Sequence, residues 1–405
     1  MNIPKLRFKE FTDEWQRNSL NKLTTYVDYR GKTPQKTDNG IFLVTAKNIK
    51  MGYIDYEISK EYISENDFND VMKRGFVQKG DVLFTTEAPM GNVAQIYNEH
   101  IALAQRVIKF RGIPLKLKNT FLKYNLMSFR FQKLLKEKAI GTTVLGIQGK
   151  VLHKLPIIYP QLKEQEKIAD FLSTVDKKVE NLENTITSLE NQKKGLLQQI
   201  FSQKLRFKDK NGNNYPNWEK KKLGDIAVLI TKGTTPTNFN DGNINFIKVE
   251  SIINSKINLS KCMSISENTH FSILSRSILK ENDILFAIAG SLGISCIVNK
   301  EILPANTNQA LAIIRLSNNV NINYIFWTLN SNIMKKYIKI SHSIGAQPNL
   351  NLKQLNDFIL PYPCLEEQTK IADFLSAFDR KLENQKTQLE HWKQIKKGLL
   401  QQMFV

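Results

Sequence analysis

One long stretch occurs twice in this chain and constrains the fold more than any other feature. Residues 164–201 read EQEKIADFLSTVDKKVENLENTITSLENQKKGLLQQIF, and residues 367–404 read EQTKIADFLSAFDRKLENQKTQLEHWKQIKKGLLQQMF. In the first copy, Ile168, Leu172 and Val175 begin a series of apolar residues whose steps alternate between four and three. That spacing is typical of a helix with the narrow apolar seam of a coiled coil. Each copy therefore predicts a long helix that packs along a second one.

The repeat extends to the segment that precedes each long helix. Both halves contain the sequence KLRF, beginning at Lys5 and at Lys204, and then a Trp and a G-x-T-P turn. Between these landmarks, short β-branched runs bounded by Gly, Asn and Asp are typical of strands. We expect strands at 40–45, 81–85, 107–110, 244–249, 283–287 and 310–314, and one amphipathic helix after each set of three, at 120–135 and 322–337.

The two halves predict a mixed α/β (α+β) fold. It contains two similar globular domains and two long helices that form an antiparallel coiled coil, related by a pseudo-twofold. The expected bounds are 1–162 for the first domain, 163–203 for the central helix, 204–365 for the second domain and 366–405 for the C-terminal helix. The loops of the two domains differ in length and in residues. If the two domains recognise targets, a repeated scaffold with different loops indicates that the two targets differ.

The charge of the chain suggests a polyanionic partner. Its 58 Lys and Arg residues outnumber its 38 Asp and Glu residues and give a net charge of +20, which attracts nucleic acid. DNA or RNA is therefore the first partner to consider, and a low-GC genome is the alternative explanation of a Lys-rich and Asn-rich chain. No apolar run approaches the roughly 20 residues of a membrane span, and the N-terminus lacks a secretory signal. We expect a location in the bacterial or archaeal cytoplasm.

Catalytic and metal-binding motifs are absent from the sequence. The three cysteines are too widely spaced for a zinc site and are interpreted as reduced thiols, and the five histidines lack the spacing of a metal pair or a catalytic triad. Residues 141–146 have the glycine spacing of a phosphate loop, but Ile147 and Gln148 replace the required Lys and Ser/Thr, so we interpret them as a turn. The chain is predicted to be non-catalytic and to bind no metal or cofactor itself.

The repeated KLRF, Trp, G-x-T-P, EQxKIADFL and KKGLLQQxF segments resemble those of the specificity subunit of type I restriction-modification enzymes, over essentially the full length. The resemblance implies two target recognition domains without an active site, each reading one half of a split, asymmetric DNA sequence. It implies as partners double-stranded DNA and two modification subunits, which use S-adenosylmethionine to methylate adenine. Through them it implies two restriction subunits, which use ATP and magnesium.

Two other functions remain open on the sequence alone. One is a scaffold that binds only proteins through its coiled coil, and the positive charge argues against it. The other is a fragment of a nuclease or methyltransferase, which requires a catalytic motif that the sequence lacks.

Candidate DNA contacts follow from residue type. Lys, Arg and hydroxyl side chains suit phosphates, and Arg, Lys, Asn and Gln suit base edges. In the first domain the candidates are Arg30, Lys32, Thr33, Lys36, Lys47, Asn48, Lys50, Arg74 and Arg106. In the second domain they are Lys232, Thr234, Thr235, Asn238, Asn240, Lys248, Ser251, Lys256 and Gln309.

The apolar stripe of each long helix widens at both ends, which predicts contacts with more than one neighbour. We expect these ends to dock on the recognition domains or on the modification subunits, through Phe171, Leu197, Phe201, Phe374, Leu400 and Phe404. Gly195 and Gly398 lie in the same segments. They are expected to permit a close approach, because glycine otherwise costs a helix about 1 kcal/mol.

Two lysines interrupt the apolar seam at the same step of the two copies. In an antiparallel pairing that matches seam to seam, Lys193 and Lys396 lie beside Asp379 and Asp176. An ammonium group at a coiled-coil core needs a carboxylate or a path to solvent. We therefore predict the ion pairs Lys193 with Asp379 and Lys396 with Asp176.

Overall fold

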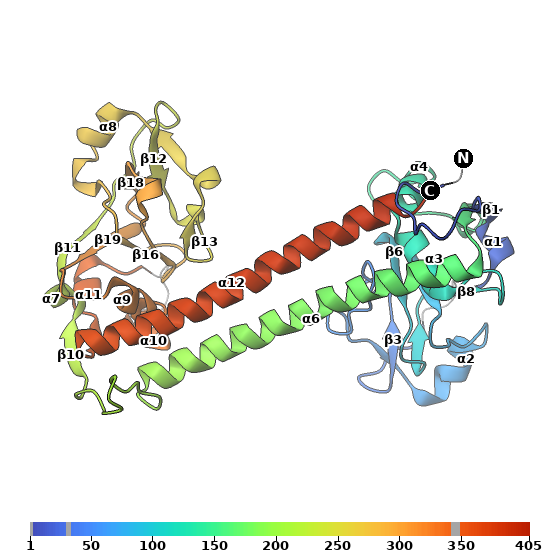
Figure 1. The fold of residues 1–405 in the computed structure, drawn as a ribbon, viewed down its shortest axis with the longest axis horizontal. Coiled ribbons are helices and arrows are strands. Elements are labelled where there is room, and N and C mark those ends of the chain that lie inside the picture. Colours follow the sequence, from blue (N-terminus) through green and yellow to red (C-terminus); the bar gives the residue numbers. More distant parts are fainter. Residues whose placement is uncertain (1–2, 30–33, 342–348) are drawn as a thin grey trace. The chain divides into compact units, whose positions relative to one another are not determined.

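The computed structural model describes residues 3–29, 34–341 and 349–405. The chain forms two compact units, which can be followed by colour in Figure 1. The first unit contains Met1–Asn184 and Thr387–Val405, and the second contains Thr185–Lys386. Each unit therefore combines a globular domain with part of both long helices, α6 (Leu162–Phe201) and α12 (Leu365–Gln402).

The globular domain of the first unit contains two sheets, with strand orders β2-β8-β5-β6 and β4-β3-β7, and the separate pair β1-β9. Alternate residues of β5 enter two cores: Val82 and Phe84 pack with residues of α3 and α6, and Leu83 packs with residues of β3 and β7. Its strands are β1 (Gln16–Ser19), β2 (Thr24–Asp28), β3 (Ile41–Val44), β4 (Tyr62–Ile63), β5 (Val82–Thr86), β6 (Met90–Gln95), β7 (Ile101–Leu103), β8 (Val107–Gly112) and β9 (Pro156–Tyr159). Its shorter helices are α1 (Leu20–Leu23), α2 (Phe68–Met72), α3 (Asn119–Met127), α4 (Phe129–Glu137) and α5 (Gly149–Leu152).

The second unit repeats this topology with the orders β11-β19-β16-β17, β15-β12-β18 and β10-β20, and adds the hairpin β13-β14. Its strands are β10 (Glu219–Lys222), β11 (Ala227–Lys232), β12 (Ile244–Ile247), β13 (Ile252–Ile253), β14 (Lys256–Ile257), β15 (Met263–Ile265), β16 (Ile284–Ala287), β17 (Ser295–Ile297), β18 (Ala305–Thr307), β19 (Leu311–Leu316) and β20 (Ile359–Tyr362). Its shorter helices are α7 (Leu223–Ile226), α8 (Glu267–Phe271), α9 (Ile322–Leu329), α10 (Asn332–Ser341) and α11 (Leu352–Asn356).

The strands expected from the sequence are confirmed as β3, β5, β8, β12, β16 and β19. The expectation of a single helix after each set is wrong. Ser128 separates α3 from α4, because its backbone is extended (φ −61°, ψ 149°) and its hydroxyl accepts a hydrogen bond from Phe131 N–H at 3.2 Å. In the second unit the Ser331 hydroxyl accepts from Ile333 N–H at 3.2 Å, where α9 gives way to α10. Serine favours such a cap over a helix interior.

Ion pairs in the first unit show that α6 and α12 run antiparallel there. Glu183 pairs with Lys393 at 3.0 Å, and Asp176, earlier on α6, pairs with Lys396, later on α12, at 2.7 Å. The predicted pair of Lys396 with Asp176 is therefore confirmed.

The second unit shows the same direction. Glu190 pairs with Lys386 at 2.6 Å, and Lys193, later on α6, pairs with Asp379, earlier on α12. The predicted pair of Lys193 with Asp379 is confirmed as well. In each unit, the ion pair that lies later on α6 lies earlier on α12, which a parallel arrangement of the helices does not allow. The ion pairs of the two interrupting lysines therefore favour the antiparallel direction.

The Glu of each EQxKIADFL segment links a long helix to the globular domain of its unit. Glu164 is 2% exposed and accepts hydrogen bonds from Arg7 Nε and Nη2, both at 2.8 Å, and from Trp15 Nε1 at 3.2 Å. This hydrogen bonding raises the pKa of Arg7. The second unit repeats the arrangement with Arg206, Trp218 and Glu367. The repeated Arg, Trp and Glu therefore serve the fold.

The C-terminal turns of the long helices pack into the globular cores. Leu197 and Phe201 of α6 join the core of the second unit, and Leu400 and Phe404, at the end of α12 and just beyond it, join that of the first. These four residues therefore pack against the globular domains, one of the two kinds of neighbour that we expected.

The role predicted for the two helix glycines is wrong for contacts within this chain. A Cβ atom at Gly195 or at Gly398 would meet no other atom within 4 Å. The chain itself therefore gives no packing reason for either glycine.

No helix in the described ranges combines the length and the apolar character that a bilayer span needs. The three cysteines are free, as expected. Burial raises the pKa of Cys296 to about 12, so this thiol is inert at neutral pH.

Candidate nucleic-acid interface

In the second unit, the G-x-T-P loop lies against the segment that connects β18 to β19. Thr234 N–H donates to the carbonyl of Thr307 at 3.2 Å, and the Thr235 hydroxyl donates to the Gln309 side-chain oxygen. A Cβ atom at Gly233 would lie 1.8 Å from the Thr307 carbonyl oxygen, so only glycine allows this approach. The structure thus brings together three predicted DNA contacts, Thr234, Thr235 and Gln309.

Arg276 belongs to the same surface and was missed by the sequence analysis. It is exposed, and its Nη2 donates to the Thr234 hydroxyl at 3.1 Å. The repeat contained the signal that identifies it: Arg276 precedes Asp283 by the same spacing at which Arg74, a predicted contact, precedes Asp81. An arginine beside two hydroxyls and an amide can hydrogen-bond either phosphates or base edges.

The other predicted DNA contacts of the second unit have different surroundings. Lys232, Asn238 and Asn240 are exposed, and the Lys248 ammonium lies 4.6 Å from the centre of the Phe239 ring. Lys256 forms a salt bridge of 3.3 Å with a carboxylate of α12, that of Glu383.

Two of the predicted DNA contacts are wrong, because their side chains are buried and engaged inside the protein. Asn48 is fully buried: its oxygen accepts from the backbone and hydroxyl of Thr45, and its nitrogen donates to the carbonyls of Asp55 and Ser59, both at 2.9 Å. Ser251 is also fully buried, and its hydroxyl donates to the Lys261 carbonyl at 3.0 Å. Both residues stabilise loops, and neither faces solvent.

The predicted DNA contacts of the first unit differ in their exposure and in their partners. Lys47 is exposed and Lys50 is half-buried. Lys36 forms a 2.8 Å salt bridge with Glu61, and Arg106 lies 3.7 Å from Glu87. Arg74 is exposed and donates to the Asp28 carbonyl at 3.0 Å. Three further candidates lie outside the described residues: Arg30, Lys32 and Thr33.

A buried aspartate at the start of a central strand supports the sheet in each unit. Asp81 accepts from Arg111 Nε at 2.6 Å and Nη2 at 2.8 Å, and Asp283 accepts from Arg315 Nε and Nη2, both at 2.7 Å. The hydrogen bond with Asp81 raises the pKa of Arg111. These bidentate pairs engage two arginines internally.

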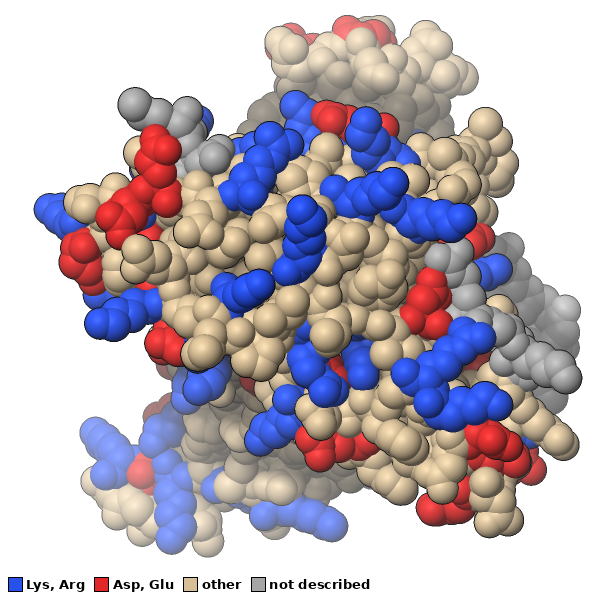
Figure 2. Space-filling model, turned by 90° about the vertical axis from the view of Figure 1, so that its right-hand side faces the viewer, with Lys and Arg blue, Asp and Glu red and all other residues tan. Residues whose placement is uncertain are grey.

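The charge distribution on one face of the first unit suits the binding of a polyanion. Figure 2 shows one face of the first unit, where Lys and Arg side chains spread over the middle and Asp and Glu side chains lie mainly toward the edges. The described residues contain no group of three or more His, Cys, Asp or Glu side chains placed to hold a metal ion. The surface is therefore suited to a polyanion.

The two halves match one family of known proteins. The family described as type I restriction modification DNA specificity domain matches residues 12–191 and 215–391. The chain is 22% identical over 416 residues to the type I restriction enzyme MjaVIII specificity subunit of Methanocaldococcus jannaschii, covering 98% of this chain and 94% of that protein. It is 26% identical over 303 residues to the type I restriction enzyme EcoBI specificity subunit of Escherichia coli, covering 68% of this chain and 62% of that protein.

A solved structure shares the fold. The S subunit of a type I restriction-modification system from M. genitalium aligns with a TM-score of 0.62 at 18% identity, covering 100% of this chain and 99% of that one. The expected fold class and the resemblance found in the sequence are therefore confirmed.

Proposed function

The chain belongs to the family of type I restriction-modification DNA specificity domains, and we propose that it selects the DNA sequence on which a type I restriction-modification complex acts. In this proposal it binds a bipartite, asymmetric target in double-stranded DNA, and each globular domain contacts one half-site. It directs adenine methylation and restriction by partner subunits and has no active site of its own. The proposal rests chiefly on two copies of a DNA specificity domain that carry different loop residues.

The difference between the loops supports two different half-sites. In the second unit Arg276 donates to the Thr234 hydroxyl, and the adjacent Thr235 donates to Gln309. This loop is therefore rich in neutral hydrogen-bonding groups. In the first unit, Arg106 stands at the start of β8, beside Glu87. Arginine favours guanine edges, and an amide favours adenine. Two such surfaces select different bases, and together they specify an asymmetric site.

Two similar aromatic surfaces support binding of two copies of one modification subunit. In the first unit Phe171 is 39% exposed and packs edge-on against Phe8, with ring centres 5.8 Å apart. In the second unit Phe374 is 37% exposed and packs against Phe207, with ring centres 5.4 Å apart. Partly exposed aromatic side chains are frequent at the centres of protein interfaces. Equivalent surfaces bind equivalent partners.

The uncovered glycines fit the same interpretation. Gly195 and Gly398 occupy equivalent positions of α6 and α12, with nothing of this chain over them. A helix of a partner can approach the backbone closely there. In this proposal the modification subunits hold S-adenosylmethionine, and two restriction subunits bound through them use ATP and magnesium.

Methylation mapping tests the proposed function. The chain is co-purified with the modification subunit encoded beside it, and methylated adenines are mapped in a random-sequence DNA library. We expect one split sequence with two unlike halves. Methylation without sequence preference, or at a palindrome, would reject the proposal.

A domain exchange tests the assignment of one half-site to each domain. Residues 204–365 are replaced by the corresponding segment of a relative with a different target. Only one half of the methylated sequence is expected to change. A change in both halves, or in neither, contradicts the assignment.

A further inference from the structure

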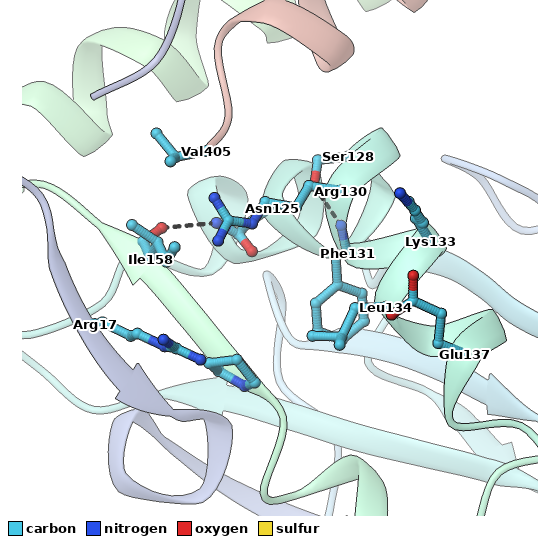
Figure 3. A pocket seen from close by; sticks show the side chains of 11 residues that line it. Arg17, Asn125, Ser128, Arg130, Phe131, Lys133, Leu134, Glu137, Ile158 and Val405 are labelled. Atoms are coloured by element: carbon cyan, nitrogen blue, oxygen red, sulfur yellow. Dashed lines mark hydrogen bonds between the residues drawn. The ribbon is translucent and has the colours of Figure 1, made fainter. Parts of the chain in front are cut away.

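A pocket in the first unit gathers positively charged side chains from two distant segments of the chain. It has a volume of about 230 Å³, and its lining includes residues of β1, β9 and α4. Figure 3 shows Arg17 from β1 facing the helix that carries Arg130 and Lys133. Phe131 and Ile158 contribute apolar surface. The pocket thus combines a cationic rim with a partly apolar wall.

Within the described residues, neither Arg17, Arg130 nor Lys133 forms a salt bridge. Glu137 and Val405, the last residue of the sequence, nevertheless line the same pocket. Burial, and then the charge of Arg17, lower the pKa of Arg130. The two guanidinium groups therefore repel each other, and a bound anion would remove that repulsion.

Strand β9 holds both segments that carry these cations, β1 and the end of α3 that leads into α4. Arg17 lies opposite Ile158 in the antiparallel pair of β1 and β9. Asn125, at the end of α3, donates its Nδ2 to the Ile158 carbonyl at 3.0 Å, and the Ser128 cap then starts α4. Buried hydrogen bonds thus fix the backbone that carries Arg130 relative to the strand that carries Arg17, and both arginine side chains are exposed.

We propose that this pocket binds a single phosphate group. Two guanidinium groups and one ammonium group supply charge and several donors for a tetrahedral oxyanion. The first turn of α4 adds the positive end of a helix dipole. The phosphate belongs either to the DNA backbone, in which case the inference rests on the proposed function, or to a free phosphorylated compound.

The internal repeat shows that this set of cations occurs once. Arg130 follows the cap residue Ser128 by two positions, and the residue two positions after Ser331 is Ile333. The second half therefore lacks the central arginine of the site. A partner that binds both halves alike, such as the proposed modification subunit, does not account for it.

Titration with inorganic phosphate tests the site. The full chain, and its variants Arg17→Gln and Arg130→Gln, are titrated by calorimetry at low ionic strength. Arg380→Gln, which removes an exposed arginine of the second unit, serves as the matched control. We expect at least tenfold weaker phosphate binding for each pocket variant and no change for the control. Thermal unfolding of each variant checks that it is folded, and Arg130→Lys should retain part of the binding.

Salt-dependent DNA binding identifies the source of the phosphate. If it is the DNA backbone, Arg130→Gln lowers the slope of log affinity against log salt by about one, and phosphate competes with DNA. An unchanged slope together with lost phosphate binding indicates a free phosphorylated compound. Folded pocket variants that bind phosphate as well as the unaltered chain overturn the proposal. If the complex with the unaltered chain methylates DNA without sequence preference, the proposed function is rejected and the phosphate site is not.

Discussion

The Lys396 ammonium lies 2.7 Å from the Asp176 carboxylate and joins the last part of α12 to the first half of α6. Asp176 also accepts a hydrogen bond from the Tyr124 hydroxyl at 2.8 Å and one from Lys123 at 3.2 Å. Lys123 is only 3% exposed. One carboxylate therefore connects both long helices with α3 of the globular domain in the first unit, and its charge is required to balance two ammonium groups.

Replacement of Asp176 should change how stability depends on pH. Burial alone would raise the pKa of Asp176, but the charges of Lys123 and Lys396 outweigh burial and lower it. A lowered pKa in the folded state means that the stabilisation is present above the unfolded pKa of about 3.9 and is lost as pH falls through the folded-state value. Asp176→Asn should lower the free energy of unfolding at pH 7 and flatten this acid dependence. Urea unfolding between pH 7 and pH 3 measures both, with Asp373→Asn, an exposed aspartate of α12, as the control. Equal acid dependence in the unaltered chain and Asp176→Asn contradicts the prediction.

Removal of the buried Glu164 should destabilise the first unit strongly. Glu164→Ala leaves the Arg7 guanidinium without its carboxylate, and such a loss costs about 3 kcal/mol. The neighbouring Glu166, which forms an exposed salt bridge with Lys118, is the matched control. Glu166→Ala should cost less than about 1 kcal/mol. Chemical denaturation compares the two, and similar losses would argue against the role assigned to Glu164.

Gly195 and Gly398, which no atom of the chain covers, should tolerate a side chain in the isolated protein. Gly195→Ala and Gly398→Ala should each raise the free energy of unfolding by about 1 kcal/mol, because alanine favours a helix and meets nothing there. Gly233→Ala should lower it, since its Cβ would collide with the Thr307 carbonyl. If the modification subunit packs on the open glycines, both stabilising substitutions should nevertheless weaken its binding. Thermal unfolding and co-purification provide the two measurements, and a destabilised Gly195→Ala chain would refute the first.

Substitutions of the adjacent residues Lys47 and Asn48 should have different effects, the first on DNA binding and the second on stability. Asn48→Ala removes four internal hydrogen bonds and should cost about 2 kcal/mol or more of stability. Lys47 is exposed, so Lys47→Glu should leave the melting temperature nearly unchanged and weaken DNA binding at low salt. Fluorescence anisotropy with duplex DNA and thermal unfolding test the pair. Normal stability of Asn48→Ala would show that its buried hydrogen bonds contribute little.

The sequence by itself determined the two-domain organisation, the long helices and their direction. Lys193, Lys396 and their aspartates could be placed from the repeat alone, because a helix has a fixed period and a seam admits few registers. The family could be recognised for the same reason, since repeated local segments such as EQxKIADFL are read directly along the chain.

Tertiary structure alone decided which polar residues reach solvent. Asn48 and Lys47 are neighbours with similar merit as DNA contacts in the sequence, yet one is fully buried and the other exposed. The hydrogen bond between Thr234 and Arg276, and the pocket that Arg17 shares with residues of α4, join segments far apart in the chain. No local period encodes such contacts, because they depend on how the sheets and helices of a domain pack together, and packing is a property of the whole fold.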